Sequence, residues 1–174
     1  RERRARALVI LDSDGQHDAA DIPKMLAPIL SDEADMVIGS RFVKGGSSDR
    51  IPAYRTLGIK VITAASNLSS DLGVKDTQSG FRAFGPLALD RIRFDVDGME
   101  STLEVLDLCG ELELKVKEVP TRIRYDVPKG SRYTAMSHGF TVLSYALITL
   151  SQKKPLLVFG LPGISLLGGG MLAG

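Results

Sequence analysis

The 174-residue sequence lacks tryptophan and contains a single cysteine, Cys109. One thiol excludes an internal disulfide, and the neighbours Leu106, Leu108 and Leu112 predict a buried structural thiol. Charges of opposite sign nearly cancel, because 22 Lys and Arg are offset by 21 Asp and Glu. The resulting net charge of +1 gives no global field that would attract nucleic acid, so we expect no nucleic-acid partner.

Charged residues are also absent after Lys154, through the end of the sequence at residue 174. About 20 apolar residues cross a bilayer. Lys153 and Lys154 precede the run, as cations do at the cytoplasmic end of a membrane segment. We therefore expect the start of a transmembrane segment over 155–174. The sequence opens without Met or a signal peptide, and we expect truncation at both ends.

Apolar runs alternate with helical patterns along the chain, which predicts an α/β fold. Residues 7–11 (ALVIL) are expected to form a buried parallel strand, and 36–39 (MVIG) a second one. A helix near 19–31 is expected to use Asp18 or Asp21 as its cap, with Pro23 in the first turn. Further helices are expected at 53–70, 86–92 and 100–110, with strands at 81–84 and within 114–125.

A helical stripe near the C-terminus has two interpretations. Its apolar residues recur at spacings of four and three, and the helix leads directly into the uncharged run. The stripe is therefore consistent either with core packing or with a helix that lies on a membrane surface. Its members are Met136, Phe140, Leu143, Leu147 and Leu150.

Two aspartates, Asp12 and Asp14, directly follow the first expected strand. Open α/β sheets bind ligands beyond the carboxyl ends of their strands, and hard divalent cations prefer oxygen ligands. The pair therefore predicts Mg²⁺ or Mn²⁺ bound together with a nucleotide diphosphate, whose departing charge the metal neutralises. Asx-turns are the structural alternative for these carboxylates. An EF-hand is excluded because His17 occupies its glycine position, and zinc is disfavoured because His138 is far away in sequence.

A second polar segment, 76–82 (DTQSGFR), joins a carboxylate, an amide, a glycine and an arginine. A positioned carboxylate can accept a proton or orient an acceptor, and arginine pairs with phosphate oxygens. A loop whose polar groups cap nearby backbone is the alternative. Several cations follow expected strands or open helices, where anionic ligands bind: Arg41, Arg55, Arg124, Lys129 and Arg132.

The order of these motifs resembles a known family. LDSDGQHD, VIGSRF, IPAYRTLGIKVITAASN, DTQSGFRAF, YDVPKGSRY and PLLVFGLPGISLL together resemble the polyprenyl-phosphate mannose and glucose synthases of archaea and bacteria, which are family-2 glycosyltransferases. The resemblance covers almost the whole chain. It implies part of a GT-A-type nucleotide-diphospho-sugar transferase fold, with a mainly parallel sheet flanked by helices. Members normally begin with strands and a nucleotide-reading acidic residue that precede this sequence.

The resemblance also implies three regions and a set of roles. Residues 1–133 would be the C-terminal part of the catalytic domain, 134–154 an amphipathic membrane-interface helix, and 155–174 the start of a transmembrane segment.

Asp12 and Asp14 would bind the metal, with Gln16 as a further metal or phosphate contact. Asp76 would be a base or orienting group near the sugar and acceptor, beside Gln78. Phosphate contacts would come from Arg41 and Arg82 on the donor side, Arg55 at the lipid phosphate, and a basic loop with Arg124, Lys129 and Arg132. Glu100 or Glu104 loosely matches an acidic residue near the sugar.

The implied activity is metal-dependent, inverting transfer of a hexose, with mannose favoured, from a nucleotide-diphosphate sugar to dolichyl or polyprenyl phosphate. GDP-mannose and UDP-glucose are the candidate donors, and the catalytic part is expected on the cytoplasmic side of a membrane. One alternative is a transferase of the same fold that acts on a polysaccharide or soluble acceptor. The other is a non-catalytic, membrane-associated remnant.

Overall fold

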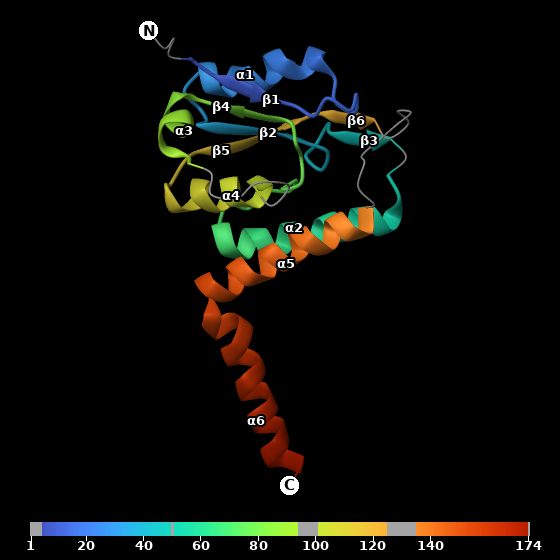
Figure 1. Cartoon of the computed structure of the whole chain (residues 1–174), viewed down its shortest axis with the longest axis vertical. Coiled ribbons are helices and arrows are strands. Elements are labelled where there is room, and N and C mark those ends of the chain that lie inside the picture. Colours follow the sequence, from blue (N-terminus) through green and yellow to red (C-terminus); the bar gives the residue numbers. More distant parts are fainter. Residues whose placement is uncertain (1–4, 50, 94–100, 125–134, 174) are drawn as a thin grey trace.

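The computed structural model describes residues 5–49, 51–93, 101–124 and 135–173. It confirms the α/β class: a sheet lies between α1 (Ile22–Leu30) on one face and a group of helices on the other, and α6 (Leu161–Ala173) projects away from this body (Figure 1). The expected site residues Lys129 and Arg132, and the alternative Glu100, lie outside the described residues.

The main sheet is mixed. Its strand order is β1 (Leu8–Ile10), β4 (Arg82–Phe84), β2 (Met36–Ser40) and β5 (Val116–Pro120). β4 runs antiparallel to both of its neighbours, whereas β2 and β5 are parallel. Three strands therefore share one direction, and the reversed β4 lies between two of them. β3 (Ser47–Asp49) and β6 (Arg122–Arg124) form a separate parallel pair. This arrangement brings the loops that follow β1 and β2 to the same edge of the sheet.

The first strand differs from its prediction. β1 pairs with β4 alone among the described strands, so it is an edge strand. Leu8 is 43% exposed and Ile10 is 45% exposed, whereas Ala7, Val9 and Leu11 pack partly against the core. The expectation of a buried parallel strand was wrong here, because β1 pairs antiparallel with β4 and is covered on one face only. A continuous apolar run does not reveal which faces of a strand are covered.

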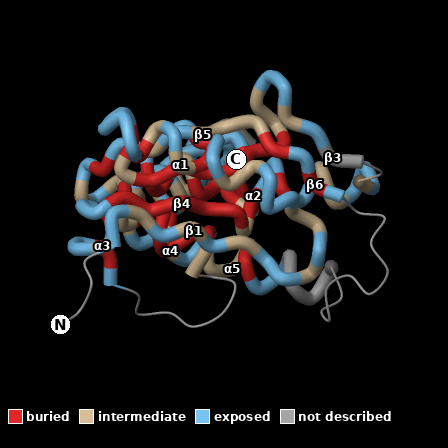
Figure 2. The backbone as a smooth tube through the Cα atoms, turned by 90° about the horizontal axis from the view of Figure 1, so that it is seen from above, coloured by how far each residue is buried: buried red, intermediate tan, exposed pale blue. Residues whose placement is uncertain are grey.

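Helix α1 covers one face of the sheet. Asp18 accepts a hydrogen bond from the backbone of Ala20 and caps a short 3₁₀ turn (Ala19–Asp21) that leads into α1, as predicted. Met25 and Ile29 of α1 are buried against Val37 of the sheet. The opposite face is covered by α4 (Ser101–Glu111), α2 (Ala53–Ser70) and α5 (Ala135–Lys153), while α3 (Pro86–Arg91) follows β4. Figure 2 shows the buried residues concentrated along the central strands.

Cys109 lies in the core between the sheet and the group of helices on this second face, and it is fully buried, as predicted. Burial raises the pKa of the Cys109 thiol to about 12, so the group stays protonated at neutral pH. Its neighbour Gly110 allows α4 to approach α2, because a Cβ there would overlap the carbonyl oxygen of Ser70.

The apolar stripe of helix α5 lies partly in the core and partly on the surface. Val142, Ala146 and Leu150 are buried against the body of the protein, where α5 packs along α2. Phe140 is 74% exposed and Leu147 is 50% exposed. The stripe read from the sequence therefore divides between the core and the surface, and Met136 lies outside the side chains that the structure describes.

A sharp corner follows α5. The chain passes through a π-helical turn (Leu156–Gly160) into α6. No single helix in the described part of the chain has the length and hydropathy to cross a bilayer, whereas Phe140–Lys153 and Leu156–Met171 meet these criteria as a pair bent by 98°. The two lysines before the corner anchor it to the body: Lys153 pairs with Asp107 at 3.2 Å, and Lys154 pairs with Asp71 at 2.8 Å.

The packing of α5 yields a prediction. Leu150→Ala should lower the free energy of unfolding by about 2–5 kcal/mol, because it leaves a cavity between α5 and the body. Leu147→Ala, three residues earlier on the exposed side, should change it by less than about 1 kcal/mol. Urea unfolding followed by circular dichroism measures both, and equal losses would contradict this packing of α5.

Candidate active site

The acidic loop, residues 11–18, follows β1 and is held by its own backbone. The N–H of Gln16 donates to Oδ1 of Asp14 at 3.0 Å, and Gly15 takes the left-handed conformation with φ of 79°. The carbonyl oxygen of Gln16 accepts from the N–H of Arg124 at 3.0 Å. One Asp14 oxygen therefore closes an Asx-turn, the structural alternative named for these carboxylates, and the loop is tied to β6.

Asp12 brings the two sequence motifs together. Its side chain is 59% exposed, and its carboxylate rests on Gly80 of the 76–82 segment. A Cβ at position 80 would overlap the carboxylate, so the contact requires glycine. Residues 68 positions apart in the sequence thus form one surface at the edge of the sheet.

His17 lies where the acidic loop and the 76–82 segment come together. Its side chain is 3% exposed, its ring packs edge-on against Phe81 with centroids 5.2 Å apart, and its Nε2 lies 3.9 Å from Oδ2 of Asp12. Burial lowers the pKa of His17, and the carboxylates of Asp12 and Asp14 act in the opposite direction. Weaker effects come from Arg41, which lowers the pKa, and from Asp76, which raises it. Sequence analysis weighed His17 only as a metal ligand and missed this central position.

Arg41 and Asp76 form a buried ion pair beside this histidine. Asp76 is fully buried and Arg41 is 7% exposed. Oδ2 of Asp76 accepts from the backbone N–H and the Nε of Arg41 at 2.9 and 2.7 Å, and Oδ1 accepts from Nη2 at 2.6 Å. The expectation that Arg41 faces donor phosphates does not fit this geometry, because its guanidinium points into the protein at Asp76. Removing either partner of such a pair costs about 3–5 kcal/mol, since the other charge stays buried.

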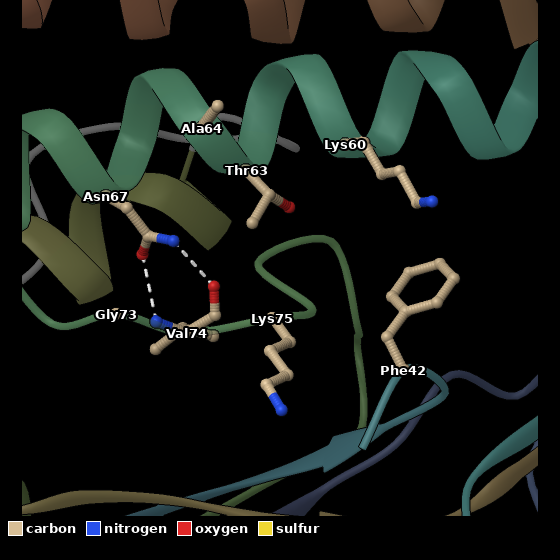
Figure 3. Close-up of a pocket in the computed structure, with 8 residues that line it drawn as sticks. All are labelled: Phe42, Lys60, Thr63, Ala64, Asn67, Gly73, Val74 and Lys75. Atoms are coloured by element: carbon tan, nitrogen blue, oxygen red, sulfur yellow. Dashed lines mark hydrogen bonds between the residues drawn. The ribbon is translucent and has the colours of Figure 1, made fainter. Parts of the chain in front are cut away.

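The segment that carries Asp76 is held on several sides. Asn67 of α2 donates to the carbonyl oxygen of Val74 at 2.7 Å and accepts from its N–H at 2.9 Å (Figure 3). The hydroxyls of Thr63 and Thr77 lie 2.9 Å apart. From β5, the carboxylate of Glu118 accepts from the backbone N–H groups of Lys75 and Asp76, each at 2.9 Å.

Arg82 supports the same segment from inside. It is 5% exposed, and its guanidinium donates to the carbonyl oxygens of Thr77, Ser79 and Thr102 at 2.9, 3.1 and 2.8 Å. Burial lowers the pKa of Arg82 to about 10, which leaves it charged at neutral pH. The expected phosphate contact of Arg82 does not fit this arrangement, because the donors are directed at main-chain oxygens.

The remaining expected residues are more dispersed. Arg55 lies half-buried in the first turn of α2, and Arg124 is exposed in β6 beside the acidic loop. Nε2 of Gln78 is buried and has no hydrogen-bond partner among the described atoms. Glu104 is buried in the first turn of α4.

A cavity of about 410 Å³ adjoins the Asp76 segment (Figure 3). It is lined by Phe42, Lys60, Thr63, Ala64, Asn67, Gly73, Val74 and Lys75.

The described residues contain no group of three or more His, Cys, Asp or Glu that could hold a metal ion by themselves. The acidic loop offers two carboxylates and the side-chain amide of Gln16, so a divalent cation there would need oxygens from a ligand. The donor set therefore fits a cation shared with a diphosphate and does not fit a site built from protein alone.

Comparison with known families explains this arrangement. The model of glycosyl transferase family 2 matches residues 2–92, slightly more than half of the chain. The chain belongs to glycosyl transferase family 2. The matched range contains the acidic loop, Arg41, the Asp76 segment and Arg82.

Two archaeal relatives of this family-2 chain have named activities. UDP-N-acetylglucosamine–dolichyl-phosphate N-acetylglucosaminyltransferase of Methanococcus voltae is 31% identical over 150 residues, which cover 85% of this chain and 59% of that protein. Dolichol-phosphate mannosyltransferase of Pyrococcus furiosus is 33% identical over 122 residues, which cover 69% of this chain and 34% of that protein. The chain thus spans three fifths or less of the length of these relatives.

A solved structure shares the fold. Glucosyl-3-phosphoglycerate synthase from Mycobacterium tuberculosis, in complex with Mn²⁺, UDP-glucose and phosphoglyceric acid, superimposes with a TM-score of 0.55 at 16% identity. The match covers 84% of this chain and 50% of that chain. It supports the GT-A-type fold expected from the sequence.

The burial of His17 predicts a pH dependence. Its pKa is lower in the folded chain than the usual 6.5, so the unfolded chain binds a proton first as the pH falls. Its contribution to the free energy of unfolding should be complete above about pH 6.5 and should decline as the pH falls towards the folded-state pKa. His17→Gln should remove this decline, measured as the difference between wild-type and variant urea midpoints at about pH 7.5 and 5.5. Parallel midpoints for the two proteins would contradict a buried neutral imidazole.

Proposed function

We propose that the intact protein transfers a hexose, with mannose favoured, from a nucleotide-diphosphate sugar to dolichyl or polyprenyl phosphate. The observation that carries this proposal is the contact between Asp12 and Gly80, which brings the acidic loop and the Asp76 segment together around His17. The two named archaeal relatives, both of which use a dolichyl-phosphate acceptor by name, support the class of acceptor. GDP-mannose and UDP-glucose are the candidate donors.

The donor diphosphate would bind at the acidic loop. Asp12, Asp14 and Gln16 would hold Mg²⁺ or Mn²⁺ with the help of the donor's phosphates, because the described residues contain no group of three His, Cys, Asp or Glu side chains that could hold the ion. The cation, when bound, neutralises negative charge on the diphosphate leaving group. Arg124, whose N–H binds the carbonyl oxygen of Gln16, is placed to add a positive charge beside the loop. Lys129 and Arg132 are proposed for the same role by resemblance alone.

Asp76 would act as an orienting group. Its carboxylate already accepts three hydrogen bonds from Arg41 and is fully buried, so its oxygens are not exposed to a substrate. A phosphate monoester is anionic near neutral pH and needs no strong base to attack a sugar carbon. Arg41 and Arg82 would then shape the sugar site through Asp76 and the main chain, with Gln78 offering its unpartnered amide to the ligand.

The acceptor phosphate would bind at the start of α2. Arg55 lies in the first turn of this helix, where the helix dipole favours anions. Pro52, at the N-cap position, provides no side-chain cap that would compete with an anion there. Attack by the phosphate oxygen from the side opposite the leaving diphosphate would invert the anomeric carbon. The protein would contribute mainly positioning and charge stabilisation.

Membrane association is proposed from two adjacent helices. α2 exposes Tyr54, Leu57, Val61 and Leu68 at helical spacing. α5, which packs along α2, exposes Phe140, Leu147 and Ile148. The uncharged α6 leaves α5 at 98°, as it would if α5 lay on a bilayer surface and α6 entered it. The catalytic part would then lie on the cytoplasmic side, and the division into regions 1–133, 134–154 and 155–174 remains part of this proposal.

Transfer can be tested in membranes that contain the full-length protein, Mn²⁺ and polyprenyl phosphate. Radiolabelled GDP-mannose and UDP-glucose are supplied in parallel, and label is counted in the organic phase. One donor should give labelled lipid, and Asp12→Ala should lower the rate by at least about 100-fold, because the cation loses a ligand in the transition state.

Asp18→Ala is the matched control, because Asp18 belongs to the same loop but caps the 3₁₀ turn before α1. It should cost about 1 kcal/mol of stability and leave the transfer rate within about twofold of wild type. Full activity of Asp12→Ala at saturating Mn²⁺ would refute the proposed donor site. Label on a polysaccharide or soluble acceptor instead would favour the alternative transferase.

The membrane proposal predicts which surface meets lipid. A fluorophore attached to Leu57→Cys should be quenched by spin-labelled lipids, whereas one on Leu30→Cys, an equally exposed leucine of α1, should not. The native Cys109 will not interfere, because it is fully buried and its pKa is raised to about 12. Equal quenching at the two positions would contradict docking through α2.

A further inference from the structure

Glu118 of β5 has a place in the site that sequence analysis did not assign. It lies next to Ile38 in the register of the parallel pair β2–β5, and its side chain reaches the segment that carries Asp76. Oε2 accepts from the N–H of Lys75 and Oε1 accepts from the N–H of Asp76, each at 2.9 Å. The two carboxylate oxygens thus accept hydrogen bonds from two consecutive backbone N–H groups.

We propose that Glu118 is a positioning residue for sugar transfer, which fixes the backbone at Asp76 and thereby sets where the buried Arg41–Asp76 pair lies beside the site. This inference rests on the proposed function and extends it to a residue outside the recognised motifs.

The main-chain contacts around Asp76 favour this role. Val74 is held by Asn67 and Thr77 by Thr63, so α2 supports the segment on both sides of Lys75 and Asp76. The N–H groups of Lys75 and Asp76 turn instead towards β5 and bind Glu118. Glu118 is therefore the described contact that connects this backbone to the sheet.

The side chain of Asp76 links the backbone contacts of Glu118 to the proposed reaction. Three hydrogen bonds from Arg41 reach the Asp76 carboxylate, so the position of this carboxylate also affects where the Arg41 guanidinium lies. A charged acceptor strengthens hydrogen bonds from backbone N–H groups, and two bonds to consecutive groups restrain rotation as well as distance. A misplacement of about 1 Å that originates away from the reacting atoms can lower a rate by about 100-fold.

Three variants of the full-length protein test the proposal in the membrane transfer assay. Glu118→Ala removes both acceptors, and Glu118→Gln keeps the shape and one acceptor oxygen. Glu33→Ala is the control, because Glu33 pairs at the surface with Lys117, the neighbour of Glu118 on β5. Glu118→Ala should lower kcat by about 10- to 100-fold and leave KM for the nucleotide sugar within about twofold. Glu118→Gln should recover part of the loss, and Glu33→Ala should match wild type.

Amide hydrogen exchange gives a second measurement that does not depend on activity. In wild type, the amides of Lys75 and Asp76 should be protected, and Glu118→Ala should raise their exchange rates by at least about tenfold without a comparable rise in the core strand β2. A simple loss of stability would raise exchange in both places. If Glu118→Ala does not fold, Glu118→Gln carries the test, because it preserves the volume of the side chain.

The outcomes separate the two proposals. Unchanged exchange at Lys75 and Asp76, or a kcat of Glu118→Ala within twofold of an active wild type, would overturn the role of Glu118. A rise in KM with unchanged kcat would also overturn it, since it would indicate ground-state binding alone. An inactive wild type with protected amides would instead refute the transfer reaction, and Glu118 would then have a structural role but no role in catalysis.

Discussion

The buried pair of Arg41 and Asp76 is the constraint on which the site depends. A carboxylate with no exposed surface needs a compensating charge and filled hydrogen bonds, and Arg41 supplies three of these bonds from its backbone and its guanidinium. The pair joins the end of β2 to the 76–82 segment, so strand and segment cannot separate without burying an unpaired charge. The surrounding contacts to Val74, Thr77 and Asp76 serve the same end, since each one limits the positions open to this carboxylate.

The sequence predicted the elements well and their environments less well. The α/β class, the cap at Asp18, the helix at 53–70 and the buried Cys109 all follow from local rules of capping, periodicity and composition. Exposure of β1 and the reversed direction of β4 depend on which strands pair, and pairing joins residues distant in the sequence. The sequence did not reveal the buried contacts of Arg41 and Arg82, because an arginine in a loop gives no sign of whether it meets a ligand, a buried carboxylate or a carbonyl oxygen. His17 and Glu118 were missed for the same reason.

The C-terminal corner links the catalytic body to the surface on which it is proposed to act. Lys153 and Lys154 look in the sequence like flanks of a membrane segment, and in the structure they also pair with Asp107, Glu111 and Asp71 of the body. The pairs with Glu111 and Asp71 have exposed carboxylates and contribute little stability individually, whereas Asp107 is buried, and together the three pairs restrict the angle of the junction. The exit of α6 is therefore joined to α2, which lines the cavity, and to α4, whose Thr102 carbonyl oxygen accepts a hydrogen bond from Arg82.

The contact between Gly80 and Asp12 has a consequence for how such a protein changes over generations. Any side chain at position 80 would occupy the space of the Asp12 carboxylate, so a mutation there would turn this carboxylate away or shift the acidic loop. A mutation that lengthened or moved the acidic loop would in turn leave a gap above the glycine. The two motifs are therefore sterically coupled, and a gene that recombined one of them from a distant relative would have to reposition the Asp12 carboxylate.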